Sequence, residues 1–223
     1  TFVGEIFNMH DRVWYLYEPC RSLRWHAGIK DTPEALPLSM CTKLVRAFLD
    51  CSFDAKDLIQ VLKDKSAVSH SRALTVVQQD FMNHTAAERH SAAIESCRGS
   101  IRVIKEIRFT KGVPDNLLYS EVKVLHLVRD VRAVLHSRLK LTAFCNAADA
   151  ANTTSIRRCI EPLCQSYRTM LRSIGSFQAS LEGRPFWQYY KFKRIKFEDV
   201  ALEPLPWVGK IYSWAGLGQV PSW

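Results

Sequence analysis

The segment 122–138, VKVLHLVRDVRAVLHSR, contains the pattern that decides the fold of this chain. Its first part, Val122 to Val128, is an apolar and β-branched run that is typical of a buried strand. From Val131 onward the apolar residues follow helical spacing. A buried strand that passes directly into a helix predicts an α/β fold, and it places Arg129 at the edge of a parallel sheet.

Outward from this segment, strand and helix patterns alternate. Strands are predicted at 13–17 (VWYLY), 101–107 (IRVIKEI) and 192–197 (FKRIKF), and helices at 1–9, over most of 34–98, at 160–181 and at 206–215. Strands separated by helices indicate a parallel sheet, and the length suits a single domain over residues 1–223. Ligands bind beyond the carboxyl ends of such strands, where Glu18, Lys105 and Arg129 are expected.

The composition is that of a folded, basic protein. Hydrophobic residues make up 47% of the chain and its formal charge is +9. Such a charge favours anionic partners. The basic residues are nevertheless spread along the chain, without the Lys/Arg runs or aromatic–basic strands of nucleic-acid-binding proteins. No nucleic-acid partner is therefore predicted, and charge alone does not separate a specific anionic ligand from a merely basic surface.

The seven cysteines indicate disulfides or buried thiols rather than a metal site. None forms a C-x-x-C pair, and none has histidines at zinc-finger spacing. An odd count fits a lumenal protein in which one cysteine lacks its partner, or a protein with some free buried thiols. Sequons at Asn83 and Asn152 favour the secretory pathway. His126 lies inside a predicted buried strand and is expected to be a core residue.

Arg129 and Ser137 are candidate ligands for a phosphate. An arginine offers a planar fork of donors that matches phosphate, and a serine hydroxyl adds another donor. Taken alone, Arg129-Asp130 equally fits an ion pair that closes a strand–helix turn. The whole of 124–138, however, resembles the 3′-phosphate-binding motif of sulfotransferases that use PAPS (3′-phosphoadenosine-5′-phosphosulfate), L-V-R-D-P-R-A-V-x-x-S-R in the Golgi carbohydrate branch. This resemblance implies that Arg129 and Ser137 hold the 3′-phosphate, with Val131 in place of the usual Pro.

The first residues resemble a second motif of this family. Thr1-Phe-Val-Gly is similar to the end of the 5′-phosphosulfate loop, R-S-G-S-[ST]-F-V-G, whose amides and following helix N-terminus cradle an anion. The resemblance implies that Thr1 contacts the donor, and that the first strand and most of this loop lie upstream. We therefore expect a truncated catalytic domain with little activity by itself. Its parent is expected to be a type II membrane protein of the Golgi lumen, with an anchor outside this chain.

Two further residues are implied to carry catalysis. The segment 14–19, WYLYEP, resembles F-Y-L-[FY]-E-P, which implies that Glu18 is the base that deprotonates the acceptor hydroxyl. Lys105 matches the lysine of a family strand ending in I-K, which implies that it neutralises charge on the transferred sulfonate. Ile107 stands where cytosolic members have a catalytic His, which favours Glu18 as the base. Without the resemblance, Glu18 fits a structural ion pair and Lys105 a surface lysine.

Two late segments resemble family motifs that we assign mostly to structure. Residues 196–204, KFEDVALEP, are similar to [VR]-x-Y-E-D-L-A-x-x-P, with Lys196 and Phe197 replacing the usual Arg and Tyr. Residues 211–217 are similar to I-Y-x-F-A-G-L.

Together these motifs imply a three-layer α/β domain with a central parallel sheet, of the P-loop NTPase-like sulfotransferase type. The implied activity is PAPS-dependent sulfonate transfer to a sugar hydroxyl, the 6-OH of GlcNAc, Gal or GalNAc in a glycosaminoglycan or glycoprotein glycan, without a metal. One alternative is a P-loop nucleotide phosphotransferase, which predicts a G-x-x-x-x-G-K-[ST] motif that this sequence lacks. Another is a non-enzymatic polyanion- or glycan-binding domain, which predicts binding with a steep salt dependence and no turnover.

Overall fold

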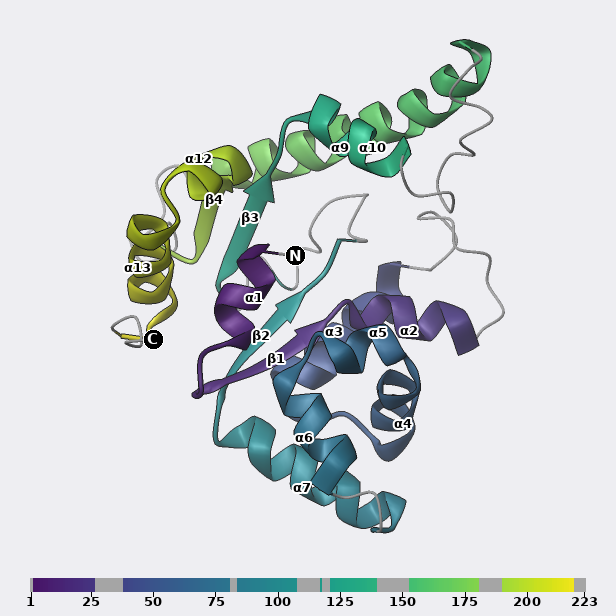
Figure 1. Ribbon diagram of the computed structural model, residues 1–223, viewed down its shortest axis with the longest axis vertical. Helices are drawn as coiled ribbons and strands as arrows, with labels where there is room; N and C mark the ends of the chain where they lie inside the picture. The colour runs from purple at the N-terminus through teal and green to yellow at the C-terminus, as the bar shows by residue number, and fades with distance from the viewer. Residues whose placement is uncertain are drawn as a thin grey trace. The chain divides into compact units, whose positions relative to one another are not determined.

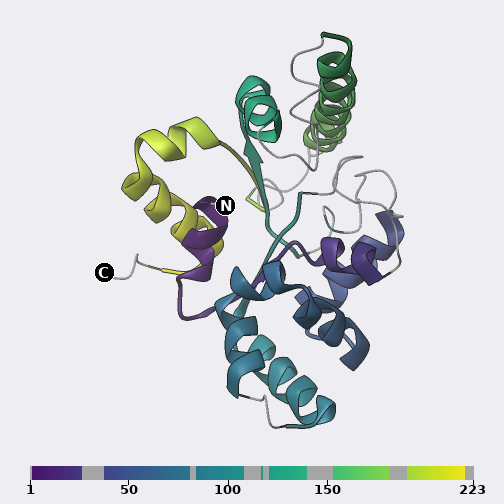
Figure 2. The ribbon, with the colours of Figure 1, turned by 45° about the vertical axis from the view of Figure 1, so that its right-hand side comes forward.

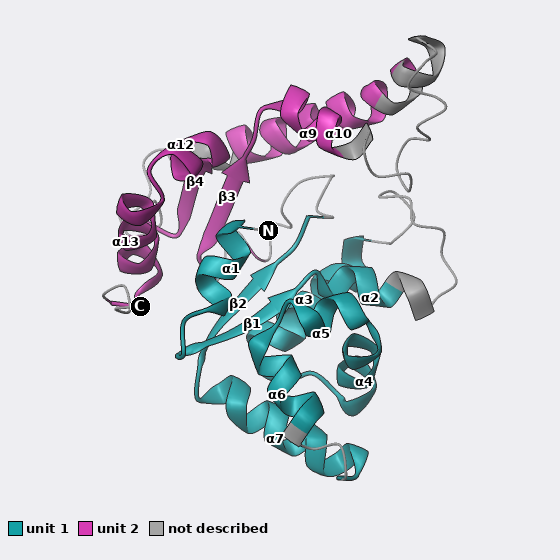
Figure 3. Cartoon of the chain, viewed as in Figure 1, with its two compact units in different colours: residues 1–109, 221–223 teal, residues 110–220 magenta. Residues whose placement is uncertain are grey.

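The computed structural model divides the chain into two compact units, each with its own pair of parallel strands (Figure 3). Unit 1 comprises residues 1–109 and 221–223, and unit 2 comprises residues 110–220. The prediction of a single domain over 1–223 stays a prediction. The structure describes residues 2–26, 38–80, 84–107, 117, 121–139, 153–180 and 190–218.

Unit 1 places a group of helices against the strand pair β1–β2 (Figures 1 and 2). The strands run parallel, and Tyr17 at the end of β1 lies opposite Lys105 at the end of β2. The described elements are α1 (Phe2–Asn8), β1 (Val13–Tyr17), α2 (Pro19–His26), α3 (Leu38–Leu49), α4 (Ala55–Lys63), α5 (Lys65–Ser69), α6 (Arg72–Asp80), α7 (Ala86–Arg98) and β2 (Ile101–Lys105).

The core of unit 1 forms where β1 meets helices α3 to α7. Trp14 of β1 stacks on Phe48 and Phe53, with ring centroids 5.9 and 5.8 Å away, and the three rings are at most 2% exposed. Burial of each such side chain stabilises the fold by about 1.5–3 kcal/mol relative to exposure. This apolar face explains why a short run such as VWYLY forms a strand.

Side-chain caps begin α4, α5 and α7 among the described helices, and α5 is capped by Asp64. Asp54 accepts a hydrogen bond from the Asp57 N–H at 2.8 Å and begins α4. Thr85 and Glu88 form a reciprocal capping box at the start of α7. Each cap satisfies amides that have no partner within the helix, and such caps typically contribute about 1 kcal/mol.

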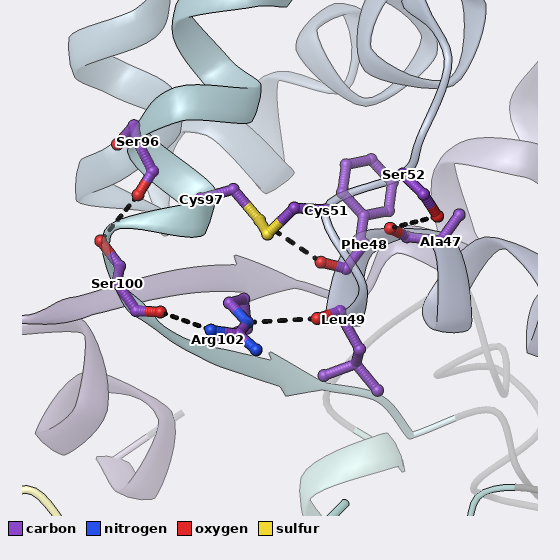
Figure 4. Close-up of a disulfide and its surroundings, with 9 residues drawn as sticks. All are labelled: Ala47, Phe48, Leu49, Cys51, Ser52, Ser96, Cys97, Ser100 and Arg102. Carbon is purple, nitrogen blue, oxygen red and sulfur yellow. Dashed lines mark hydrogen bonds between the residues drawn. A yellow bond between two sulfur atoms is a disulfide. The ribbon is translucent and has the colours of Figure 1, made fainter.

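Two disulfides join the helices of unit 1. Cys20 in α2 is bonded to Cys41 in α3. Cys51, just after α3, is bonded to Cys97 in α7, and Figure 4 shows this second bridge. Beside the second bridge, Arg102 of β2 donates from Nε to the Leu49 carbonyl at 3.1 Å. The disulfide interpretation of the cysteines is thus confirmed for these four.

The remaining cysteines belong to unit 2. The structure has Cys164 as a free, half-buried thiol. The side chains of Cys145 and Cys159 lie outside the described residues.

Unit 2 contains the strand of segment 122–138 and its parallel partner. Val128 at the end of β3 lies opposite Lys196 at the end of β4. One buried side chain comes from α10, one from β4, one from α12 and two from α13, each at most 2% exposed: Ile174, Ile195, Val200, Ile211 and Tyr212. The described elements are β3 (Val124–Val128), α9 (Val131–Leu139), α10 (Thr153–Ser180), β4 (Phe192–Lys196), α12 (Phe197–Leu202) and α13 (Pro204–Ala215).

The predicted elements are present, with shifted bounds. The strand predicted at 101–107 ends at Lys105, because Glu106 turns its side chain to the start of α2. The strand predicted at 192–197 ends at Lys196, and Phe197 already begins α12. Helix α10 starts earlier than predicted, at Thr153. Helix α2 was not predicted; Pro19 begins it, at a position where proline lacks only an amide that would have no helical partner.

The prediction of an α/β fold with parallel strand pairing is confirmed. In the described residues β1 pairs with β2 and β3 pairs with β4. None of the described helices is both long and apolar enough to cross a bilayer.

Candidate active site

Glu18 and Lys105 meet at the carboxyl ends of β1 and β2. The Glu18 N–H donates to the Lys105 carbonyl at 2.8 Å, which extends the strand pairing by one residue. The Lys105 ammonium donates to Glu18 Oε1, and the two side chains are 16% and 4% exposed. The structure therefore joins the two predicted catalytic residues of unit 1 in an ion pair that is largely shielded from water.

An aromatic side chain covers the ammonium of this pair. Lys105 Nζ lies 4.4 Å from the centroid of the Tyr17 ring, and Tyr17 stacks on His70 with centroids 4.5 Å apart. A cation over an aromatic face gains about 0.5–1 kcal/mol at an exposed site and more when it is desolvated. Tyr17 therefore helps to hold the Lys105 side chain at the end of the strands.

The backbone of Glu18 is strained. Its φ is +46°, in the left-handed region that residues other than glycine rarely adopt. Such a conformation costs on the order of 1–3 kcal/mol and persists only where the surrounding structure imposes it. This turn separates β1 from α2, and it is the turn that presents the Glu18 carboxylate to Lys105.

In unit 2, Arg129 directly follows β3 and lies beside Phe197. The pairing of Val128 with Lys196 makes Arg129 and Phe197 the next residues along, and the guanidinium carbon lies 4.6 Å from the ring centroid. Arg129 Nε is buried and has no hydrogen-bond partner among the described residues. Leaving a buried donor unpaired is costly, and a phosphate oxygen would satisfy it. The arrangement fits an anionic ligand.

The acidic residues around Arg129 are already engaged. Asp130 forms an ion pair with Arg132 at 2.6 Å, and hydrogen bonds from Arg132 lower the pKa of Asp130 to about 2. Glu198 Oε1 accepts the Asp130 N–H at 3.0 Å, which, with a smaller effect of the Arg129 charge, lowers the Glu198 pKa. The alternative in which Arg129 and Asp130 form an ion pair is therefore not what the described residues show.

The structure says less about the other two residues that are predicted to bind PAPS. Ser137 lies on α9 with its side chain exposed to solvent. Thr1 lies outside the described residues. The roles predicted for Thr1, Ser137, Arg129, Glu18 and Lys105 all stay predictions.

Sequence reasoning missed the contacts made by Tyr17, Phe197 and Glu198. Tyr17 precedes Glu18 in the motif at residues 14–19. Phe197 and Glu198 lie in the segment 196–204, which sequence reasoning assigns mostly to structure. The signal that could have revealed the latter two is strand order, because a residue just after β4 lies beside one just after β3 if the strands are parallel neighbours.

His126 of β3 is half-buried and lies outside the fully buried core that was expected for it. Its Nε2 lies 3.0 Å from Met170 Sδ, and its Nδ1 is buried with no partner among the described residues. Burial, with a smaller effect of the Arg194 charge, lowers the pKa of His126 from 6.5 to about 4. The ring is thus neutral at physiological pH.

Comparison with known proteins now assigns the chain to a family. The model of the sulfotransferase domain family matches residues 42–221, and the chain belongs to this family. Carbohydrate sulfotransferase 6 from Homo sapiens is 30% identical over 100% of this chain and 62% of its own length. Carbohydrate sulfotransferase 5 and carbohydrate sulfotransferase 3 from Mus musculus are 28% and 24% identical, and the chain covers 62% and 53% of them. No solved structure matches the chain. The family predicted from the motifs is thereby confirmed.

Proposed function

We propose that the protein containing this chain transfers a sulfonate group from PAPS to a sugar hydroxyl of a glycan. Family membership and the carbohydrate sulfotransferases among its relatives support this proposal. The observation that carries it is the buried Nε of Arg129, just after β3, which has no hydrogen-bond partner among the described residues and belongs to a guanidinium that lies over the Phe197 ring. A donor of this kind suits a phosphate group such as the 3′-phosphate of PAPS.

In this proposal Arg129 and the exposed Ser137 hydroxyl bind the 3′-phosphate, and Thr1 contacts the 5′-phosphosulfate. Phe197 limits the conformations of the guanidinium from one face, while Glu198 fixes the following amide. Preorganised donors of this type bind a phosphate without first losing side-chain freedom.

Glu18 and Lys105 supply the chemistry. Glu18 takes the proton of the attacking hydroxyl as the new bond forms between its oxygen and sulfur, while the bond from sulfur to the bridging phosphate oxygen breaks. The electron pair of that bond stays on the departing phosphate, and Lys105 stabilises its charge. An ammonium has three donors, so Lys105 can keep its bond to Glu18 and still donate to the leaving oxygen.

The acceptor and the cellular location follow from the family branch that the motifs resemble. We propose the 6-OH of GlcNAc, Gal or GalNAc in a glycosaminoglycan or glycoprotein glycan. We place the parent protein in the Golgi lumen as a type II membrane protein, anchored by a segment outside this chain. The bridges Cys20–Cys41 and Cys51–Cys97 support a lumenal location, because such bonds persist in oxidising compartments. No metal is required by this chemistry.

The test is transfer of labelled sulfate from PAPS to chondroitin, keratan and GlcNAc-terminated oligosaccharides by the parent protein, which includes the residues upstream of Thr1. Arg129→Ala is expected to weaken binding of PAP, the desulfated product, by about 10- to 100-fold, the worth of a charge-assisted hydrogen bond. Glu18→Gln is expected to abolish turnover and leave PAP binding intact. Arg132→Ala is the matched control, because it removes an exposed arginine of the same turn.

Three results would contradict the proposal. Equal PAP binding by the wild type and Arg129→Ala would show that Arg129 does not bind the 3′-phosphate. Equal loss of PAP binding and turnover in Glu18→Gln would contradict the assignment of Glu18 as the base. Salt-sensitive binding of polyanions with neither PAP binding nor turnover would favour the non-enzymatic alternative.

A further inference from the structure

The turn that presents Glu18 is connected to its surroundings through Cys20. Glu18 has a strained backbone, Pro19 begins α2, and Cys20 follows in the first turn of that helix. A strained turn needs external contacts to keep its geometry. Beyond the strand ladder itself, Cys20 provides two such contacts, one through its amide and one through its sulfur.

The amide of Cys20 donates to the carboxylate of Glu106. Glu106 Oε2 accepts the Cys20 N–H at 3.0 Å, while Oε1 accepts the N–H of Ile107 at 2.9 Å. Glu106 immediately follows Lys105 at the end of β2. One residue therefore links the end of the strand that carries Lys105 to the start of the helix that follows Glu18.

The sulfur of Cys20 provides the second contact, through the disulfide to Cys41 of α3. A carboxylate oxygen of Glu106 and the two sulfur atoms lie within 4.8 Å of one another. The hydrogen bond and the covalent bond thus act on the same residue, two positions after the carboxylate of Glu18.

We propose that Glu106 is a positioning residue for catalysis: by accepting the Cys20 N–H it holds the strained turn in the geometry that aims Glu18 at Lys105. This inference rests on the proposed function of Glu18. Both carboxylate oxygens of Glu106 accept backbone N–H groups, so Glu106 itself is occupied and is not a second base. Its negative charge also lies at the N-terminus of α2, where the helix dipole stabilises it.

Two conservative variants separate the position of the acceptor from its charge. Glu106→Gln keeps one oxygen that can accept the Cys20 N–H and removes the charge, with loss of the exposed bond from the Ile107 N–H. Glu106→Asp keeps the charge but withdraws both oxygens by one methylene. If Glu106 acts by positioning Glu18, Glu106→Gln is expected to retain kcat within about threefold of the wild type. In Glu106→Asp and Glu106→Ala, kcat is expected to fall by about 10- to 100-fold, since misplacement of a reacting group by about 1 Å can lower the rate about 100-fold. The KM for PAPS is expected to stay unchanged.

Asp54→Ala is the matched control, because it removes a carboxylate that caps α4 elsewhere in unit 1. It is expected to lower thermal stability about as much as Glu106→Ala while leaving kcat unchanged, which separates positioning from general destabilisation. If Glu106→Ala does not fold, the Gln and Asp variants alone decide the question.

Four outcomes are possible. The expected pattern of an active Gln and an impaired Asp supports the proposal. An inactive Gln, whether Asp is active or not, would overturn it. Wild-type kcat in all Glu106 variants would overturn it while leaving the proposed function intact, and a wild-type protein without transfer activity would overturn both.

Discussion

Replacing Lys105 by Met is expected to destabilise the protein strongly, because it leaves the Glu18 carboxylate buried without its cation. Glu18 is 3% exposed, and its side chain is the partner of Lys105 in the ion pair at the strand ends. Removing one member of a buried pair typically costs about 3–5 kcal/mol. Met preserves the aliphatic stem, so lost packing contributes little.

The lower end of that range applies here. The Lys105 side chain is 16% exposed, so water reaches part of the pair and screens it. We expect a loss of about 3 kcal/mol in the free energy of unfolding. For a protein of this size that corresponds to a decrease in Tm of roughly 6–12 °C.

The assay is urea unfolding with linear extrapolation, combined with hydrogen exchange of residues 13–17 and 101–105 to report on unit 1. The double variant Lys105→Met/Glu18→Gln contains neither charge and is expected to recover to within about 1 kcal/mol of the wild type. Lys43→Met, which replaces an exposed lysine of the same unit, is expected to change stability by no more than about 0.5 kcal/mol.

Either of two results would contradict the proposed effect of the unpaired Glu18 charge. Lys105→Met could lose less than about 1 kcal/mol, which is the range of a surface ion pair. Alternatively, the double variant could be as unstable as the single variant, which would trace the loss to packing rather than to an unpaired charge.

Three further predictions concern other parts of the molecule. Phe197→Leu removes the ring below the guanidinium and is expected to weaken PAP binding about 3- to 10-fold by calorimetry; Phe197→Tyr should bind normally, and equal affinities for all three proteins would contradict the role of the ring. Because burial and Arg194 lower the pKa of His126 from 6.5 to about 4, the unfolded chain binds a proton that the folded one does not between these pH values. Stability is therefore expected to fall by up to about 3 kcal/mol as the pH drops through this window, and His126→Gln should flatten the profile measured by urea unfolding. Breaking the Cys51–Cys97 bridge, whose cysteines are 46 positions apart, by replacing both with Ala is expected to cost about 4 kcal/mol; an unchanged Tm under non-reducing conditions would show that the bridge adds no stability.

Local pattern was sufficient to predict most helices and strands. The run VWYLY and the segment 122–138 were recognisable because apolar periodicity depends only on neighbouring residues. The same patterns placed Glu18, Lys105 and Arg129 at the ends of strands, which the structure confirms. The bounds were less accurate, since the end of β2 depends on a hydrogen bond between Glu106 and the distant Cys20.

Contacts between distant segments were beyond the reach of the sequence. Nothing near Cys20 identifies Cys41 as its partner, and nothing near Arg129 identifies Phe197 as the ring on which its guanidinium lies. These pairings follow from the register between strands and from the packing of helices, which arise only when the whole apolar core forms.

The sequence by itself thus determined the family, the type of most elements and which residues could carry the chemistry, because motifs and periodicity are local. The tertiary structure alone decided that Glu18 is paired with Lys105 in a shielded site. It also decided that Asp130 binds Arg132, while Arg129 Nε has no hydrogen-bond partner in the described part of the chain. The physical reason is that burial and partner choice depend on which side chains from remote parts of the chain share one environment, and those determine whether a charged group is neutralised or left available for a ligand.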